Sequence, residues 1–165
     1  MKLEGSKVYL RPIDVNDTDS MVKWRNREFV RKNFINQEPL TPEIHLNWLK
    51  TKVDTGKVVQ FIITVNDTGR AIGSVYLRDI DKDEKKAEYG ILIGEEDALG
   101  HGYGTEACRL MIDYAKDVLK LDRIFLRLRK SNEIAHKSYL KAGFKDREQA
   151  KCANSEIIFM DYIFK

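Results

Sequence analysis

Apolar and polar residues alternate in several short segments of this chain, which is the pattern of half-buried β-strands. Prolines, glycine turns and charged runs separate these segments, as expected at strand ends. Two of the segments flank the turn Asn66-Asp67-Thr68-Gly69 and predict a hairpin. The pattern predicts strands over residues 7–11, 58–65, 71–79, 87–93, 123–128, from 144 onward, and 156–164.

Apolar residues spaced three or four positions apart predict helices between these strands. Two helices are expected over residues 14–26 and 28–34. A third begins at Thr41-Pro42, where Thr is the N-cap and Pro takes the first helical position. We expect this third helix to end near Gly56 and to direct inward the residues Ile44, Trp48, Leu49 and Val53.

Two further helices are expected in the second half of the chain. One begins within residues 100–107 and extends to about Leu119. The other is capped by Asn132 and ends at Ala142, with Gly143 at the C′ position. The apolar side of the earlier helix carries Ala107, Met111, Ala115 and Val118. This order predicts an α/β fold with one mixed sheet of about seven strands, a meander followed by a parallel strand–helix–strand unit.

Length and composition limit the class of protein. The 165 residues and a hydrophobic share of 42% predict one domain over residues 1–165. The net charge is +3 without a block of basic residues, which argues against a nucleic-acid partner. Without an 18-residue apolar run or a signal-peptide pattern over residues 1–11, we expect a cytoplasmic protein with no membrane partner. Cys108 and Cys152 lack metal-ligand spacing, so we expect free thiols and no metal site.

Three glycines alternate with larger residues in Gly100-His101-Gly102-Tyr103-Gly104-Thr105, where the fourth helix begins. Glycines leave backbone N–H groups unshielded, and a helix N-terminus adds unpaired donors and a favourable dipole end. Together they predict a cradle for a phosphate or pyrophosphate. The segment matches neither a nucleotide P-loop nor the dinucleotide-binding spacing, and alone it is also compatible with a tight turn.

Asn132 and Tyr139 lie seven residues apart on the expected fifth helix, so two helical turns bring them to one face. A tyrosine can pack its ring while its hydroxyl points into a cleft. The alternative is a tyrosine that only packs in the core, and the spacing alone leaves both interpretations open.

The run Gly102-Tyr103-Gly104-Thr105-Glu106-Ala107 after a strand, followed by Asn132…Ala135…Tyr139…Gly143-Phe144, resembles the GCN5-related N-acetyltransferase (GNAT) family. The strand Ala87-Glu88-Tyr89-Gly90 is similar to the ribosomal-protein alanine N-acetyltransferases. The segment Trp24-Arg25-Asn26 is similar to the nucleotide-linked amino-sugar N-acetyltransferases. One position departs from the family pattern: Leu99 stands where a Gln or Arg usually assists the phosphates, which leaves more of the binding to the backbone amides.

The resemblance implies acetyl-coenzyme A as co-substrate and a sheet that splays between its fourth and fifth strands. The pantetheine arm would run along Leu92, Ile93 and Gly94, where a backbone N–H could stabilise the oxyanion. Asn132 would bond the same arm. The pyrophosphate would bind the amides of Gly100, His101, Gly102, Tyr103, Gly104 and Thr105.

The implied reaction is direct attack of a neutral amine on the thioester. Tyr139 is the expected proton donor to the leaving thiolate, although ordinary pKa values of about 10 and 8.5 make full transfer uphill by about 2 kcal/mol. Glu88 is the expected base, acting through a water, and His45 is the second candidate. The alternatives are a Glu88 that faces solvent or pairs with an arginine, and a His45 that orients substrate or lies on the helix surface.

The expected acceptor site consists of Trp24, Arg25, Asn26 and His45, since aromatic and guanidinium groups suit a nucleotide base or a diphosphate. They equally suit core packing and ion pairs. Three functions stay open: acetylation of a small amine such as a nucleotide-linked amino sugar or a polyamine, acetylation of a peptide N-terminus, and acyl-CoA binding without turnover. Dimers are common in the family, so a homodimer is a candidate assembly.

Overall fold

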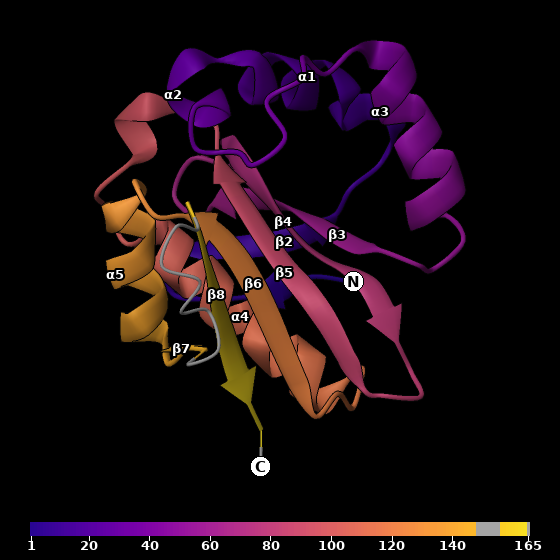
Figure 1. Ribbon diagram of the computed structural model, residues 1–165. Helices are drawn as coiled ribbons and strands as arrows, with labels where there is room; N and C mark the ends of the chain where they lie inside the picture. Colours follow the sequence, from indigo (N-terminus) through magenta and orange to yellow (C-terminus); the bar gives the residue numbers. More distant parts are fainter. Residues whose placement is uncertain (148–155, 165) are drawn as a thin grey trace.

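The computed structural model describes residues 1–147 and 156–164, which form one mixed sheet with helices on both faces (Figure 1). Cys152 lies outside the described residues. The strands are β1 (Leu3–Glu4), β2 (Val8–Pro12), β3 (Val59–Val65), β4 (Ala71–Asp81), β5 (Lys86–Ile93), β6 (Arg123–Arg129), β7 (Lys145–Asp146) and β8 (Ile157–Ile163). The helices are α1 (Thr18–Asn26), α2 (Glu28–Arg31), α3 (Pro42–Trp48), α4 (Tyr103–Asp117) and α5 (Glu133–Ala142), with short turns at Val15–Asp17, Leu49–Val53 and Glu96–Ala98.

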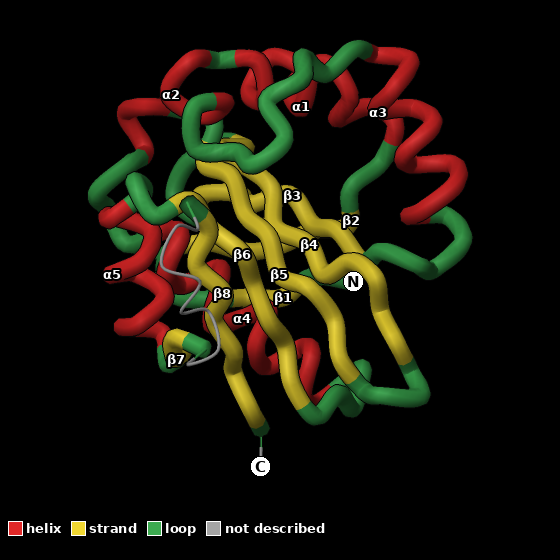
Figure 2. Tube along the Cα trace, viewed as in Figure 1, coloured by secondary structure: helices red, strands yellow, loops and turns green. Residues whose placement is uncertain are grey.

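The eight strands of the described residues are ordered β1-β2-β3-β4-β5-β6-β8-β7 (Figure 2). Neighbouring strands are antiparallel except β5 and β6, which are parallel and joined through α4. The predicted α/β class, the meander and the parallel unit are confirmed. The strand β1 was not predicted, because two residues are too few to show a period.

β5 and β6 pair over only three positions, from Lys86↔Arg123 to Glu88↔Phe125. β5 nevertheless continues to Ile93, and β6 continues to its own end. One edge of β5 is therefore unpaired with β6 beyond Glu88. This confirms the splay expected between the fourth and fifth predicted strands.

Alternation along the strands divides the core into two layers. On one face of the sheet, Ile63 of β3 and Tyr89 of β5 pack with Met111 of α4. On the other face, Ile62 packs with Trp24 and the other apolar residues of the N-terminal helices. Figure 1 shows α1, α2 and α3 grouped over one part of the sheet and α4 behind it.

The face of α3 that is buried differs from the face that the apolar spacing predicted. Ile44, expected to face inward, is 54% exposed, whereas the neighbouring His45 is 2% exposed. His45 Nδ1 lies 2.9 Å from the hydroxyl of Thr18, so the buried ring has a hydrogen-bond partner on this side. Apolar spacing could not indicate this, because it assigns a histidine to the polar side.

The ends of the last two helices follow the sequence signals with one exception. Asn132 Oδ1 accepts a hydrogen bond from the amide of Ala135 at 3.4 Å, and Gly143 ends α5 with φ at 112°. α4 ends at Asp117, so Val118, expected on its apolar side, is 56% exposed.

Glu106, in the first turn of α4, ties this helix to the N-terminal strands. Its Oε1 accepts a hydrogen bond from the Ser6 hydroxyl at 2.7 Å, and its Oε2 accepts from the amides of Lys7 at 2.7 Å and Val8 at 2.8 Å. Burial would raise the pKa of Glu106, but these hydrogen bonds outweigh it and the pKa is lowered. This carboxylate therefore fixes the position of the helix start at which the glycine segment ends.

Glu106→Ala is expected to lower the free energy of unfolding by about 2 kcal/mol, because a partly exposed carboxylate loses three hydrogen bonds. Folding lowers the pKa of Glu106, so its carboxylate stabilises the folded state fully above the ordinary pKa of a glutamate. This stabilisation is lost as the pH falls through the lowered pKa. Urea unfolding measures it: the gap between wild type and variant should close below about pH 4. Glu106→Gln keeps the shape without the charge and should be intermediate. A gap independent of pH would contradict the assignment.

Candidate active site

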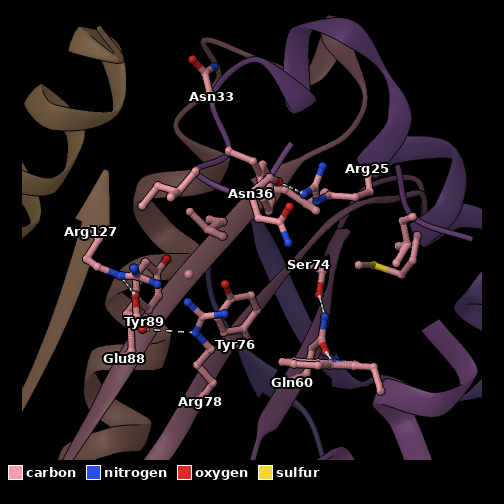
Figure 3. A pocket seen from close by; sticks show the side chains of 18 of the residues that line it. Arg25, Asn33, Asn36, Gln60, Ser74, Tyr76, Arg78, Glu88, Tyr89 and Arg127 are labelled. Atoms are coloured by element: carbon pink, nitrogen blue, oxygen red, sulfur yellow. Dashed lines mark hydrogen bonds and ion pairs between the residues drawn. The ribbon is translucent and has the colours of Figure 1, made fainter. Parts of the chain in front are cut away.

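A pocket of about 600 Å³ lies on the sheet face that the N-terminal helices cover (Figure 3). α1, α3 and the segment 33–40 form one wall. At one end the lining includes Tyr89, Asn132 and Tyr139, next to the splay between β5 and β6. The floor consists of alternate residues of β3, β4 and β5, namely Gln60, Ser74, Tyr76, Arg78, Glu88, Gly90 and Leu92.

Glu88 lies on this floor between two arginines and is 7% exposed. Its Oε1 accepts from Arg78 Nε at 3.2 Å, and its Oε2 accepts from Arg127 Nε at 2.7 Å. A carboxylate offers about four acceptor positions, so these two bonds leave room for a water or a ligand. Glu88 is also the last residue of β5 that pairs with β6, which places it at the apex of the splay.

Tyr139 lines the same pocket from α5. Its ring packs edge-on against Tyr89, with centroids 6.1 Å apart, and against Phe144 at 5.8 Å. Burial raises the pKa of Tyr139, and the neighbouring Cys108 and Tyr76 raise it further. The hydroxyl therefore keeps its proton at neutral pH and can donate it in a hydrogen bond.

Arg25 enters the pocket wall from α1. Its guanidinium lies over the ring of Phe34, 3.9 Å from the centroid, and Nη2 donates to the carbonyl of Asn36. Nη1 is buried and has no hydrogen-bond partner in the described part of the chain. Burial lowers the pKa of Arg25, with the effect of Tyr76 opposing, but a guanidinium stays protonated in proteins. An incompletely paired positive charge therefore faces this wall.

His45 lines the pocket from α3, so it is not a helix-surface residue. Its Nε2 is buried and meets no hydrogen-bond partner within residues 1–147 and 156–164. Burial lowers the pKa of His45, although the charge of Asp17 opposes this, so the ring is neutral at neutral pH. His45 stays a candidate base.

The glycine segment lies at the start of α4, outside the lining of this pocket. Gly100 and Gly102 have φ values of 80° and 82°, in the left-handed region that favours glycine. The amides of Tyr103, Gly104 and Thr105 have no acceptor among the described residues, as is usual in the first turn of a helix. A Cβ at Gly104 would be in ordinary van der Waals contact with Ile91 and Ile93, at 3.8 and 3.9 Å. Free donors at a helix N-terminus fit a pyrophosphate.

Side chains around the glycine segment hold it in place. The ring of His101 stacks on Tyr103 with centroids 5.3 Å apart, and the His101 carbonyl accepts from Lys7 Nζ at 3.0 Å. Thr105 Oγ1 lies 3.0 Å from Ser138 Oγ of α5. Lys7 also brings a positive charge close to the expected pyrophosphate position.

The unpaired edge of β5 offers backbone groups beyond Glu88. The amide of Gly94 donates to Ile72 at 2.7 Å and its carbonyl accepts from Arg27, so Gly94 faces β4 and its amide is not free. Backbone groups alternate between the two edges of a strand, so those of Ile93 face the open edge. The expected place of the pantetheine arm therefore fits Ile93 better than Gly94.

Most of the expected acid, base and acceptor residues meet in the pocket, but Trp24 and Asn26 do not. Trp24 is 2% exposed and its indole N–H donates to Glu95 at 2.7 Å, so it packs in the core. Asn26 exchanges two hydrogen bonds of 2.8 Å with the backbone of Leu40 and so holds the segment 33–40. The expected residues that line the pocket are Arg25, His45, Glu88, Leu92, Asn132 and Tyr139.

Sequence reasoning missed Tyr76, Arg78, Arg127 and the segment 33–40. Gly90 carried a signal, since a glycine inside a strand often marks the close approach of another group. A Cβ at Gly90 would lie 2.3 Å from the Tyr76 ring. That signal points to a neighbour but not to its identity.

Cys108 is a free thiol, 1% exposed, and burial raises its pKa to about 12, so it is no nucleophile at neutral pH. Among the described residues, no three His, Cys, Asp or Glu side chains are grouped so as to hold a metal ion. The helices described are too short or too polar to cross a lipid bilayer.

Comparison with known proteins places the chain in a family. A model of the acetyltransferase (GNAT) domain matches residues 7–145. Spermidine N(1)-acetyltransferase of Escherichia coli K12 is 30% identical over 138 residues, which is 83% of this chain and 72% of that protein. An uncharacterized protein of Methanocaldococcus jannaschii is 30% identical over 151 residues, which is 90% of this chain but only 30% of the relative.

Solved structures share the fold. Spermidine N-acetyltransferase from Vibrio cholerae in complex with CoA and spermine has a TM-score of 0.84 at 19% identity, covering 96% of both chains. Apo FdhC, a nucleotide-linked sugar GNAT, has a TM-score of 0.81 at 21% identity, covering 99% of this chain and 90% of that one. The resemblance seen in the motifs is confirmed by the domain match. The chain belongs to the GNAT acetyltransferase family, whose members are acetyl-CoA-dependent N-acetyltransferases.

Proposed function

We propose that this protein transfers the acetyl group of acetyl-CoA to the primary amine of a small molecule bound in the pocket. The observation that carries the proposal is that Tyr139 and Glu88, the expected acid and base, line one cavity of about 600 Å³. A cavity of this size suits a small ligand. The segment 33–40 forms part of its wall, which favours a small acceptor over a protein N-terminus that needs an open groove.

Acetyl-CoA supplies the activated acyl group as a thioester. The free amides of Tyr103, Gly104 and Thr105 would hold its pyrophosphate, and the open edge of β5 at Ile93 would pair with its pantetheine arm. Asn132 uses its Oδ1 to cap α5, so its side-chain N–H₂ is the group that would donate to the arm.

In a direct attack the acceptor nitrogen loses two protons and the sulfur gains one. The acceptor ammonium must lose one to expose its lone pair, and Glu88 accepts it through a bridging water. As the new C–N bond forms and the C–S bond breaks, the Tyr139 hydroxyl hydrogen-bonds to the sulfur and passes its proton late, because burial raises its pKa. The nitrogen of the new amide gives up its second proton, which restores Tyr139 through water, and Glu88 releases the first proton to solvent.

Two small acceptor classes have support. The similarity to spermidine acetyltransferases favours a polyamine. The resemblance carried by Trp24-Arg25-Asn26 favours a nucleotide-linked amino sugar, and of these three residues only Arg25 lines the pocket.

Thiol release from acetyl-CoA tests the proposed function. Purified protein would be given spermidine, a uridine-diphosphate-linked amino sugar, simple amino acids and amino sugars, and peptides that begin with Ser or Ala. We expect release with at least one small amine and none with the peptides. Acetylation of peptides alone would move the assignment to a protein N-terminus, and acetyl-CoA binding without any release would leave a binding module.

A further inference from the structure

The charges that line the pocket are unequal. The lining contains three arginines, Arg25, Arg78 and Arg127, against two glutamates, Glu38 and Glu88. Glu88 is shared by two of the arginines, and Glu38 is an exposed residue of the segment 33–40. His45 is neutral because burial lowers its pKa. The pocket is therefore net positive before any ligand enters.

The arginine donors are not used up. The hydrogen bonds from Arg78 and Arg127 to Glu88 both use Nε, and their terminal nitrogens have no acceptor among the described residues. Arg25 Nη1 is buried and has no partner there either. A buried charged donor without an acceptor costs free energy, and a ligand oxygen removes that cost.

The ring of Tyr76 lies near the middle of this lining, with the guanidinium of Arg78 5.7 Å from its centroid. Tyr76 interacts electrostatically with Arg78, Arg127 and Arg25, and Figure 3 shows Tyr76 on the floor, between Arg25 above it and the pair Arg78 and Arg127 beside Glu88. Gly90 leaves room for this ring, since a Cβ there would lie 2.3 Å from it. The site is thus a polar chamber with positive donors on two sides.

Such a chamber discriminates between the two acceptor classes. A polyamine carries several positive charges at neutral pH and needs carboxylates that are free to pair with it, whereas the buried carboxylate here already binds two arginines. An oxyanion has the opposite requirement, since guanidinium groups bind carboxylates and phosphates through two parallel N–H bonds.

We infer that the acceptor of this enzyme carries an anionic group, a carboxylate or a phosphate, which binds to the guanidinium of Arg25, whose buried Nη1 has no partner among the described residues. This inference rests on the proposed function, because it assigns a substrate class to the same pocket. It places the amine of the acceptor toward Glu88 and Tyr139, and the anion toward α1.

Matched amines test the charge requirement. Alanine and alaninamide differ in a carboxylate, glucosamine 6-phosphate and glucosamine differ in a phosphate, and spermidine supplies a polycation. In at least one pair, the anionic member should have a kcat/KM at least about 10-fold higher, the scale of one charge-assisted bond. A preference within the alanine pair identifies a carboxylate as the recognised group, and a preference within the glucosamine pair identifies a phosphate. Equal values within both pairs, or spermidine as the best acceptor, would overturn the inference while acetyl transfer itself stands.

Substitution of Arg25 tests the site. Arg25→Gln should raise the KM of the anionic member at least about 10-fold and change its neutral partner little, and Arg25→Lys should recover part of the loss. A purely structural role, through Phe34 and Asn36, would weaken both members equally and would refute the assignment. Arg123→Gln is the matched control, because Arg123 pairs with Asp161 and does not line the pocket. If no amine in the panel released thiol, the proposed function itself would fail. If thiol were released without a preference for the anionic amines, only the inference about the acceptor's charge would fail.

Discussion

Tyr139→Phe lowers kcat at least about 10-fold and leaves the KM for acetyl-CoA nearly unchanged, if the hydroxyl donates to the departing sulfur. The substitution removes one oxygen from a ring that packs against Tyr89 and Phe144, so the packing is retained. Because burial raises its pKa, the hydroxyl keeps its proton until the sulfur develops charge, and this interaction exists only late in the reaction.

The neighbouring tyrosine provides the matched comparison. Tyr89 is 2% exposed and also lines the pocket, so Tyr89→Phe removes the same atom from the adjacent ring. Tyr114→Phe removes a hydroxyl from a ring that packs on Phe61, away from the pocket. Steady-state kinetics with saturating acetyl-CoA should show a large loss in kcat for Tyr139→Phe only. A loss for Tyr89→Phe with normal Tyr139→Phe would transfer the role to Tyr89.

Glu88→Gln should lower kcat roughly 100-fold, because an amide cannot accept the proton of the amine. The substitution keeps the side-chain shape but leaves Arg78 and Arg127 without a carboxylate, so the melting temperature should also fall. Rate and stability must therefore be separated.

Asp161→Asn is the control that separates them. Asp161 binds Arg123 at 3.2 Å and Arg147 at 2.8 Å, the same arrangement of one carboxylate between two arginines, but it lies outside the pocket lining. We expect a comparable loss of stability and an unchanged kcat. If Glu88→Gln behaves like Asp161→Asn, Glu88 only positions its arginines, and His45, with its unpartnered Nε2, becomes the base to test.

The difference between Trp24 and Arg25 illustrates what the sequence left undecided. Both are on α1 and both were expected to contact the acceptor, yet Trp24 packs in the core while Arg25 lines the pocket. Helix periodicity separates faces, but a tryptophan suits a core and a ligand site equally well. The same holds for His45, whose burial depends on a hydroxyl from α1, far away in sequence.

The sequence by itself determined the helices and strands other than β1, their order, the glycine segment at the start of α4 and the placement of Asn132 and Tyr139 on one helix. These features follow from alternation, caps and spacing, which are local properties of the chain. Only the tertiary structure decided which residues meet in the pocket. Tyr76 and Arg78 came from β4, Arg127 from β6 and Arg25 from α1. Alternation of apolar and polar residues predicts that a strand has two different faces. Which helix or loop covers each face depends on contacts between distant segments, and those contacts place the three arginines around one pocket.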